Sequence, residues 1–395
     1  MAVIKYKTPD NWIKYDVSSI TSKLVEAATL VKTLSSMPYK LEWVKELQEM
    51  HLRREVSGTT RIEGAEFTQR EFDVAMSEES PEELRNRSQR QVNSAMKTYR
   101  WIATLDENIP VDGELILNIH AMMIRGADDD HCEPGVLRRK NENVTFGSPL
   151  QRGSEGGTEC KEAFEGLTQA ISREFSGHNG IIQALAAHYH LAALHPFSDG
   201  NGRTARAVES LLLKREGLKD LNFIAMSNYY YDEKRRYLEV LSEVRKQNYD
   251  LTPFLLFGLD GIISQSAALL DIIKENLKVF LFRKTVKELF GSDLFPFPRR
   301  RAIHDRQMAI LDVLLDENNF KIELMNLLIK VNHLYSELKN SGKAISRDLN
   351  DLILLRAIRQ YEKVPTQIYY QLQLDWPATI TEKQFIRRIK EFSSK

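Results

Sequence analysis

The stretch HPFSDGNGRTAR, residues 195–206, is the most informative part of this 395-residue chain. It places a histidine, an aspartate, an asparagine, two glycines and two arginines within roughly three helical turns. A glycine-containing turn that leads into a helix is a ready anion site, because unpaired backbone N–H groups and the helix dipole both point at the ligand. The stretch therefore predicts a site for a nucleotide triphosphate with its own general base.

The glycines and arginines in this stretch have complementary roles. Gly200 and Gly202 lack a Cβ, so the backbone can approach a phosphate closely and adopt a positive φ. A helix that begins near Gly202 places Arg203 and Arg206 on one face, where both guanidinium groups reach one phosphate tail. A glycine pair alone is weak support for such a site, whereas all these residue types in one loop are hard to explain by chance.

The remaining polar residues of the stretch supply a metal ligand and a base. Asp199 is the candidate ligand for a divalent cation. His195 is the candidate proton-transfer group, since an imidazole near its natural pKa accepts protons at neutral pH. Pro196 tends to end the preceding helix and so holds the imidazole at the mouth of the loop.

The stretch resembles the signature of the Fic family (filamentation induced by cAMP), HPFx[D/E]GNGRxxR, at every fixed position. Members of this family typically transfer AMP from ATP onto a hydroxyl group of a target protein. The resemblance thus implies a protein adenylyltransferase with ATP as substrate, Mg²⁺ at Asp199, and His195 as the base that deprotonates a Ser, Thr or Tyr hydroxyl. The ATP-binding residues that it implies here are His195, Gly200, Asn201, Gly202, Arg203, Thr204, Ala205 and Arg206. Kinase-like relatives carry lysine in place of Gly202, so the glycine favours AMP transfer.

A second segment, SGTTRIEG at residues 57–64, resembles the inhibitory motif of the same family, [S/T]xxxE[G/N]. Thr59, Glu63 and Gly64 occupy its fixed positions. The resemblance implies that Glu63 pairs with Arg206 and also belongs to the ATP site. A carboxylate on Arg206 competes with the γ-phosphate, so ATP binds in a poorly reactive pose and the enzyme is autoinhibited. A related family member uses this glutamate to remove AMP, which leaves both that reverse reaction and self-AMPylation open.

A third segment, GVLRRKNENVTFGSP at residues 135–149, resembles the flap of the family. The alternation at Asn143, Val144, Thr145 and Phe146, ended by glycine and proline, predicts a short hairpin. In the family such a hairpin lies over the active site and binds the target segment as an added strand. A plain connecting hairpin is the alternative.

Further downstream, SNYYYDEKRRYLEVL at residues 227–241 resembles the stretch that closes the adenine side of the site. Tyr229 and Tyr237 are candidates for packing on the base or for a ribose contact, and a place in the core is equally open for each. His188 and His190 are two residues apart and do not share a helix face, which favours structural roles over metal binding.

Composition narrows the class of protein. The formal net charge is zero, so nothing global attracts the chain to nucleic acid or anionic lipid. Cys132 and Cys160 are too few and too far apart for a disulfide framework or a zinc ribbon. The N-terminal residues lack an apolar signal core, and no stretch approaches about 18 uninterrupted apolar residues. We therefore expect a soluble cytoplasmic protein that has no membrane segment.

Local signals place several helices. Residues 80–83, SPEE, form a capping box with proline at the first helical position, which predicts a helix that runs past Tyr99. The alanine-rich run IIQALAAHYHLAAL at residues 181–194 predicts a buried helix that delivers His195 at its end.

The resulting fold class is mainly α: a helical Fic core with a short β-hairpin flap, followed by a winged-helix-like domain. We expect an N-terminal helical region with the inhibitory motif at residues 1–100 and the catalytic core at 101–290. The run GSDLFPFPRRRA at 291–302 is expected to be a linker, because it combines prolines, a glycine and consecutive arginines. The winged-helix-like domain then covers residues 303–395.

Residues 303–395 resemble a winged helix, with three short helices, the last of which begins near Ser346, followed by wing strands from Ala357 onward. The third helix of such a domain can bind DNA. Basic residues such as Lys343 and Arg347 are offset by Asp348, Asp351 and Glu362, so we favour protein recognition or dimerisation over DNA binding.

Two functional hypotheses follow. The first is an autoinhibited protein adenylyltransferase whose partner is a target protein with a hydroxyl side chain. The alternative is a nucleotide-sensing, DNA-binding transcriptional regulator with little transferase activity. The intact His195 favours the first, since a sensor needs no base. The oligomeric state stays open, with a homodimer the commonest arrangement for such chains.

Overall fold

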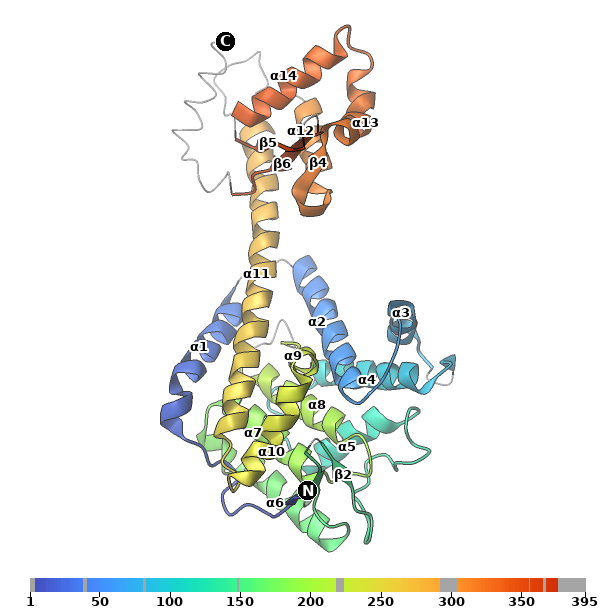
Figure 1. The fold of residues 1–395 in the computed structure, drawn as a ribbon, viewed down its shortest axis with the longest axis vertical. Helices are drawn as coiled ribbons and strands as arrows, with labels where there is room; N and C mark the ends of the chain where they lie inside the picture. Colours follow the sequence, from blue (N-terminus) through green and yellow to red (C-terminus); the bar gives the residue numbers. More distant parts are fainter. Residues whose placement is uncertain are drawn as a thin grey trace. The chain divides into compact units, whose positions relative to one another are not determined.

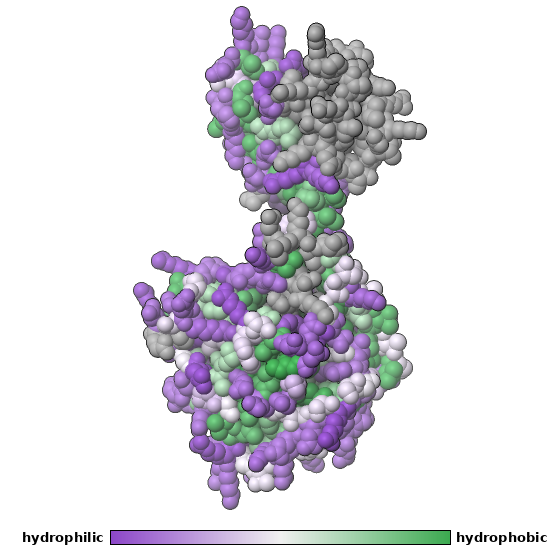
Figure 2. Space-filling model, turned by 180° about the vertical axis from the view of Figure 1, so that it is seen from behind, coloured by the Kyte–Doolittle hydropathy of each residue, from purple (hydrophilic) through white to green (hydrophobic). Residues whose placement is uncertain are grey.

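The computed structural model describes residues 4–37, 41–80, 83–147, 149–217, 224–291, 305–354, 356–364 and 367–375. It divides into two compact units, Met1–Leu270 and Asp271–Lys395. Both units are built mainly from helices, which confirms the prediction of a mainly α fold (Figure 1). In the view of Figure 2 the surface of the first unit is mostly hydrophilic, with hydrophobic residues in smaller groups between.

The first unit is a helical assembly. Its helices are α1 (Val17–Ser36), α2 (Leu41–Ile62), α3 (Gln69–Ser77), α4 (Arg87–Thr104), α5 (Gly113–Ile124), α6 (Thr158–Ser172), α7 (Gly180–Leu194), α8 (Asn201–Arg215), α9 (Met226–Asp232), α10 (Lys234–Lys246) and the start of α11 (Thr252–Gly291). A short 3₁₀ turn, Phe175–Gly177, precedes α7.

Helices α7 and α8 form the centre of this unit, and the signature loop connects them. Nearly every residue of α7 is buried, because its alanines allow other helices to pack closely on all sides. The helix ends at His195, whose φ of 55° is left-handed and whose N–H bonds the carbonyl of Leu191. The predicted buried helix that ends at His195 is thus present.

The start of α4 differs from the prediction. The helix begins at Arg87 and not at residue 81, because the Asn86 side chain caps it by accepting a hydrogen bond from the backbone N–H of Gln89. Residues 81–82 of the predicted start lie outside the described residues, and the Glu83 N–H bonds the Ser80 carbonyl. A capping box does occur nearby, where Thr68 and Glu71 satisfy each other's backbone N–H groups at the start of α3.

The predicted flap hairpin is present as part of a small sheet. Strand β2 (Thr145–Phe146) pairs antiparallel with β3 (Gln151–Arg152), and β1 (Ile4–Lys5) pairs parallel with the other side of β3. The strand order is β1-β3-β2, so β2 is an edge strand. Its outer backbone groups are therefore available to another strand.

Helix α11 is long and apolar. By length and composition its segment Thr252–Lys284 could cross a membrane, yet half of its most apolar window is buried inside the structure. The core helix of a globular unit meets the same criterion. Gly291 is the last residue of α11, and the rest of the predicted linker at 291–302 lies outside the described residues.

Within its described residues, the second unit contains three further helices and a three-stranded antiparallel sheet. Its elements are α12 (Asp305–Leu315), the 3₁₀ turn Asn318–Phe320, β4 (Lys321–Glu323), α13 (Leu324–Tyr335), α14 (Ser341–Leu354), β5 (Ile358–Val364) and β6 (Gln367–Leu372). The strand order is β4-β6-β5. A core of buried side chains that includes Leu314, Leu327 and Leu352 holds the helices against the sheet.

Candidate active site

The signature loop closes on itself before α8 begins. The Asn201 side chain accepts a hydrogen bond from the Phe197 N–H and donates one to the Phe197 carbonyl, both at 2.8 Å. Gly200, with a φ of 74°, is the N-cap of α8 and provides no side-chain cap. The first N–H groups of α8 are therefore available to an anion. Thr204 and Ala205 are buried in the first turns of the same helix.

Two glycines of the loop lie in close contact with side chains. A Cβ on Gly200 would lie 2.6 Å from Cδ1 of Ile124, and the left-handed backbone there already disfavours a side chain. A Cβ on Gly202 would lie 2.1 Å from Oε1 of Glu63 and 2.9 Å from Nη1 of Arg206. The inhibitory motif and the signature therefore meet at Gly202.

Glu63 and Arg206 form the ion pair that the sequence predicts. Arg206 Nη2 donates to Glu63 Oε1 at 2.6 Å, while its Nε donates to Thr59 Oγ1 at 2.9 Å and Nη2 also reaches the Thr59 carbonyl. Burial alone would raise the pKa of Glu63, but the Arg206 guanidinium holds it below its usual range. Gly64, with a φ of 94°, ends the turn after α2.

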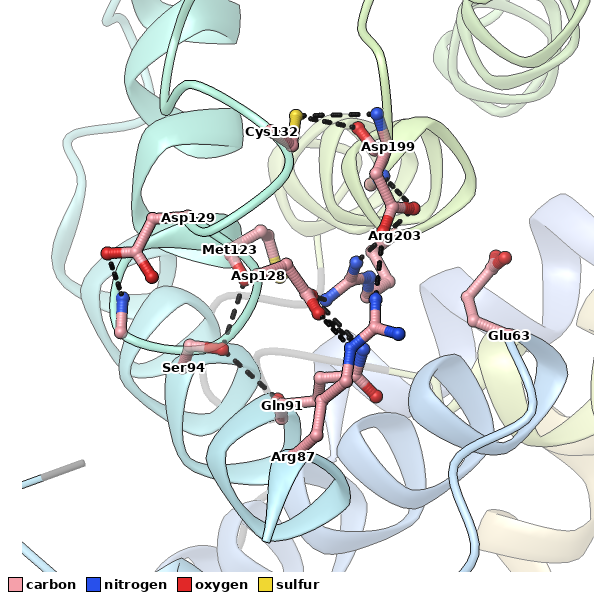
Figure 3. A network of polar contacts seen from close by, with 12 residues as sticks. Glu63, Arg87, Gln91, Ser94, Met123, Asp128, Asp129, Cys132, Asp199 and Arg203 are labelled. Carbon is pink, nitrogen blue, oxygen red and sulfur yellow. Dashed lines mark hydrogen bonds and ion pairs between the residues drawn. The ribbon is translucent and has the colours of Figure 1, made fainter. Parts of the chain in front are cut away.

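The first signature arginine has a different partner, which sequence reasoning missed. Arg203 Nη1 donates to Asp128 Oδ2 at 2.6 Å, and the Asp128 carboxylate also accepts hydrogen bonds from Gln91 and Arg87 (Figure 3). Both Arg203 and Asp128 are almost fully buried. The acidic run at residues 128–130 is the only local signal that could have suggested a partner.

Arg203 also keeps an unused donor. Its buried Nε–H has no partner in the part of the chain that the structure describes. A buried donor without a partner is costly, so the site is better satisfied when an anion accepts from it. Together with the uncapped start of α8, this observation shows that the residues fit a phosphate group.

Asp199 lies beside these arginines and is 36% exposed. Its Oδ1 accepts from the Gly200 N–H, and its Oδ2 lies 3.2 Å from Arg87 Nη2 and 3.3 Å from His131 Nε2. Ligand atoms of Asp128, His131 and Asp199 all lie within 4.8 Å of one another. Carboxylate oxygens suit Mg²⁺, so the residues present also fit a divalent cation.

The contacts of His195 define the state of its ring. Nδ1 lies 3.0 Å from the Ala192 carbonyl, which can only accept, so Nδ1 carries the proton and Nε2 keeps its lone pair. Burial lowers the pKa of His195 to about 4, although the hydrogen bond to Ala192 opposes this shift. The ring stacks on Phe146 with centroids 3.8 Å apart. At neutral pH His195 is therefore an uncharged imidazole that can accept a proton at Nε2.

Arg138 is a second residue that sequence reasoning missed. It is 2% exposed, and burial lowers the pKa of its guanidinium. Its Nε donates to the His195 carbonyl at 2.8 Å, and Nη1 and Nη2 donate to the carbonyls of Glu142 and Ser154 at 2.6 and 2.7 Å. Arg138 thus ties the signature loop to both sides of the flap.

The predicted flap residues have two roles in the structure. Thr145 and Phe146 form the edge strand, and Phe146 lies on the His195 ring. The Val144 carbonyl accepts from the Gly153 N–H, and the Asn143 side chain accepts from the Gly156 N–H. Asn143 and Val144 therefore hold the flap in shape.

The two tyrosines lie in different surroundings. Tyr237 is buried, and its hydroxyl bonds His188 Nε2 at 2.9 Å in a network that includes Glu209. Burial raises its pKa to about 12. Tyr229 lies on Phe257 and lines a surface pocket of about 420 Å³ whose lining includes no residue of 195–206. The structure thus does not bring Tyr229 to the loop.

The structural interpretation of the two histidines of α7 is consistent with their contacts. His188 is fully buried and bonds both Glu209 and Tyr237. His190 is also fully buried and bonds the Trp12 carbonyl. Neither is available to a solvent-accessible metal ion.

Comparisons with known proteins agree with this site. A profile described as "Fic/DOC family" matches residues 110–213, which include the whole signature. The protein adenylyltransferase Fic of Culex quinquefasciatus is 34% identical over 170 residues, and that of Aedes aegypti is 41% identical over 170 residues. Each alignment covers 43% of this chain and 31% of the relative, so the chain spans about a third of the length of these relatives.

Solved structures show the same fold. A Fic family protein from Desulfovibrio desulfuricans G20 is similar at a TM-score of 0.57 and 17% identity, over 93% of this chain and 98% of that chain. Fic-1 from C. elegans is similar at a TM-score of 0.54 and 19% identity, over 66% of this chain and 74% of that chain. The chain therefore has the helical fold of Fic proteins. Its residues 110–213, which contain the signature, match the Fic/DOC family profile, and its relatives support a transferase.

Proposed function

We propose that this protein transfers AMP from ATP to the hydroxyl group of a Ser, Thr or Tyr side chain in a target protein. The observation that carries the proposal is the neutral His195, whose Nδ1–H bonds the Ala192 carbonyl, in the same loop as the uncapped start of α8. A base and an anion site in one loop are what transfer of a phosphorus group to an alcohol requires.

Different residues of the loop carry out proton transfer and charge neutralisation. His195 Nε2 accepts the proton of the target hydroxyl as its oxygen forms a bond to the α-phosphorus of ATP. The bond from that phosphorus to the oxygen that bridges to the β-phosphorus breaks, and diphosphate leaves with both bonding electrons. Arg203 and Arg206 balance the negative charge on the phosphate oxygens. Mg²⁺ bound at Asp199 would supply further charge neutralisation.

Glu63 restrains this chemistry in our proposal. Its carboxylate accepts from the Arg206 Nη2 that a γ-phosphate would use, and its Oε1 lies against the backbone of Gly202. ATP then binds only when Glu63 moves or when the phosphates take a less reactive position. Once AMP is attached to a target, the same carboxylate is well placed to activate water for its removal.

The flap supplies the docking site for the target. Strand β2 is the edge of its sheet, and Phe146 lies directly on the His195 ring. A target segment that pairs with β2 as an added strand would have its register set by main-chain hydrogen bonds. That register brings one hydroxyl side chain to His195 Nε2.

Intact mass spectrometry tests the proposal. The full chain is incubated with ATP and Mg²⁺, and the expected result is a subpopulation heavier by one or more adenylate groups through self-modification. The control replaces ATP with an analogue that has a methylene group between the α- and β-phosphorus atoms, which cannot release AMP. An adduct that forms equally with the analogue, or none even in the Glu63→Gly variant, would refute AMP transfer.

The second unit supports a second candidate function, DNA binding. In the sequence, Asp348 offsets the charge of the nearby basic residues. In the structure its side chain is buried and accepts hydrogen bonds from Arg306 and Tyr335. The exposed positions of α14 include Lys343, Ser346, Arg347 and Asn350. Burial and the nearby Asp348 raise the pKa of the half-buried Asp351 to about 6. Because Asp348 is buried, the exposed face of α14 carries less negative charge than the sequence suggests.

A gel-shift titration with random duplex DNA separates this candidate from a protein-recognition role. DNA binding predicts an affinity that falls steeply with salt, because phosphate contacts release counterions. It also predicts weaker binding by the Lys343→Ala/Arg347→Ala variant. Affinity that is absent at low salt, or unchanged in that variant, excludes DNA binding by α14.

A further inference from the structure

Arg87, the first residue of α4, lies among three groups that commonly bind metals. Its Nε donates to Asp128 Oδ1, and its Nη2 lies 2.9 Å from His131 Nε2 and 3.2 Å from Asp199 Oδ2. Figure 3 shows the side chain reaching from α4 toward Asp128 and Asp199. The same three side chains form the group whose ligand atoms lie within 4.8 Å of one another. The Arg87 guanidinium thus lies where a metal ion bound by these three side chains would lie.

The neighbouring Asp130 fixes the orientation of His131. Nδ1 of His131 lies 2.6 Å from Asp130 Oδ1, and an ionised carboxylate can only accept, so Nδ1 donates. The lone pair on Nε2 therefore faces Asp199 Oδ2, 3.3 Å away. A histidine that ligates a metal through one ring nitrogen usually donates a hydrogen bond from its other ring nitrogen to a carboxylate. Two acceptors at this distance repel each other unless a cation or a donor lies between them, and Arg87 Nη2 provides that donor.

The exposure of the partners shows which contacts can be exchanged. Asp128 is fully buried and keeps Arg203 and Gln91 as partners if Arg87 leaves. The Arg87 side chain is 52% exposed and Asp199 is 36% exposed, so their ion pair lies at the surface. Exposed pairs of this kind are weak and break at little cost. Arg87 can therefore turn toward solvent without unfolding the site.

We propose that Arg87 is a tethered cation that occupies the divalent-cation position, and that a cation which displaces it binds both Asp199 and His131. This deepens the proposed function, from which the assignment of Asp199 as a metal ligand comes. Glu63 and Arg87 then act as a pair: Glu63 takes the place of a phosphate on Arg206, and Arg87 takes the place of the metal on Asp199. Protein side chains therefore occupy both the phosphate position and the metal position of the site.

Binding of Mn²⁺ alone tests the first part of the proposal. The electron paramagnetic resonance signal of free Mn²⁺ is measured against the full chain without nucleotide or target. Arg87→Gln removes the charge but keeps a donor for Asp128, and we expect it to bind Mn²⁺ roughly tenfold more tightly than the wild type. Arg87→Lys keeps the charge and should stay close to the wild type.

Arg100 offers a matched control. It lies on the same helix, its side chain is also 52% exposed, and it pairs with Glu49 at 3.6 Å. Arg100→Ala should bind Mn²⁺ as the wild type does. Equal affinities for the wild type, Arg87→Gln and Arg87→Lys would overturn the proposal, as would the same gain in Arg100→Ala.

The role of His131 is tested in the Arg87→Gln background. Adding His131→Ala should lose most of the gained affinity for Mn²⁺, and adding Asp199→Asn should abolish binding. Unchanged binding after His131→Ala would remove His131 from the ligand set. Because no ATP and no target are present, these results are independent of AMP transfer, so failure of this proposal is distinguishable from failure of the proposed function.

Discussion

The two halves of α8 hold their charged groups in different ways. In the first half, Arg203 and Arg206 face carboxylates that come from other parts of the chain, Asp128 and Glu63. In the second half, the Glu209 carboxylate bonds His188 and the Tyr230 hydroxyl inside the core. The first half thus pairs two buried cations with carboxylates from other parts of the chain, one of which, Glu63, is partly exposed, whereas the second half encloses an anion.

A second buried carboxylate continues the enclosed region. Glu55 of α2 accepts hydrogen bonds from the Ser227 N–H at 3.0 Å and from the hydroxyls of Ser210 and Tyr99 at 3.1 and 3.2 Å. Burial raises the pKa of Glu55. Glu63, two turns further along the chain, is 35% exposed and has the Arg206 guanidinium as its partner.

The difference between the two halves of α8 indicates where a bound ligand can replace a protein group as the partner of a charged side chain. Removal of a partner from the enclosed region leaves buried groups unsatisfied, which costs stability. In the first half of α8, an incoming phosphate or metal ion can replace the carboxylate or guanidinium that now occupies the position. We therefore assign ligand binding to the first half and fold stability to the second.

The largest expected effect contrasts two histidines. His195→Ala should lower the rate of AMP transfer by about 10²- to 10⁴-fold, since the general base is lost, while the protein remains folded. His188→Ala should lower the thermal midpoint, because it removes a buried hydrogen-bond partner from both Glu209 and Tyr237 and leaves a cavity in the core. Transfer rates and circular dichroism melts of both variants check this. A His195→Ala variant that keeps its activity would show that His195 is not the general base.

Glu55→Ala should cost stability without any gain of activity. The substitution leaves the buried Ser227 N–H without its carboxylate acceptor and removes one hydrogen bond of Tyr99, and we expect a loss of about 2–4 kcal/mol in the free energy of unfolding. Urea denaturation measures the loss. Unchanged stability would show that this carboxylate is not part of an enclosed network.

The pH dependence of stability provides a smaller effect. Burial lowers the pKa of His51 to about 4, and neither of its ring nitrogens has a partner among the described residues. Between pH 6.5 and 4 the unfolded chain binds a proton that the folded chain excludes, so stability falls as the pH falls through this window. His51→Leu removes this loss.

Urea midpoints at pH 7 and pH 5 measure the effect. We expect His51→Leu to gain about 1–2 kcal/mol more, relative to the wild type, at pH 5 than at pH 7. An equal difference at the two values would mean that His51 titrates in the folded protein as it does in the unfolded chain.

The smallest effect concerns the tyrosine that lines the surface pocket. Because this pocket includes no residue of the signature, Tyr229→Ala should change the KM for ATP by less than about twofold. Steady-state kinetics of the Glu63→Gly protein with and without Tyr229→Ala measures the change. A rise of tenfold or more would place Tyr229 at the adenine.

Sequence alone predicted the parts of the site that depend on short spacing. His195 lies at the end of one helix, Gly200 lies in the turn that follows, and Arg206 lies near the start of the next helix. Local sequence is enough to predict these three positions. The pairing of Glu63 with Arg206 came from two motifs that the family connects. The helix expected to run from residue 81 begins instead at Arg87, where the side chain of Asn86 caps it.

The remaining site residues could not be predicted, because their contacts form only when distant helices pack. Asp128 meets Arg203 across 75 positions of sequence, and Arg138 reaches the His195 carbonyl across 57. Nothing in the local sequence of Arg87 distinguishes it from other surface arginines of α4. Asp348 looked solvent-exposed and acidic in the sequence, yet the packing of α12 and α13 buries it.

The most direct test of the account is self-labelling with α-labelled ATP by the wild type, Glu63→Gly and Glu63→Gly/His195→Ala. Loss of the carboxylate frees the Arg206 Nη2, so we predict that Glu63→Gly labels at least about tenfold more strongly than the wild type and that the double variant does not label. Labelling of Glu63→Gly at or below the wild-type level would contradict the claim that Glu63 occupies the place of a phosphate.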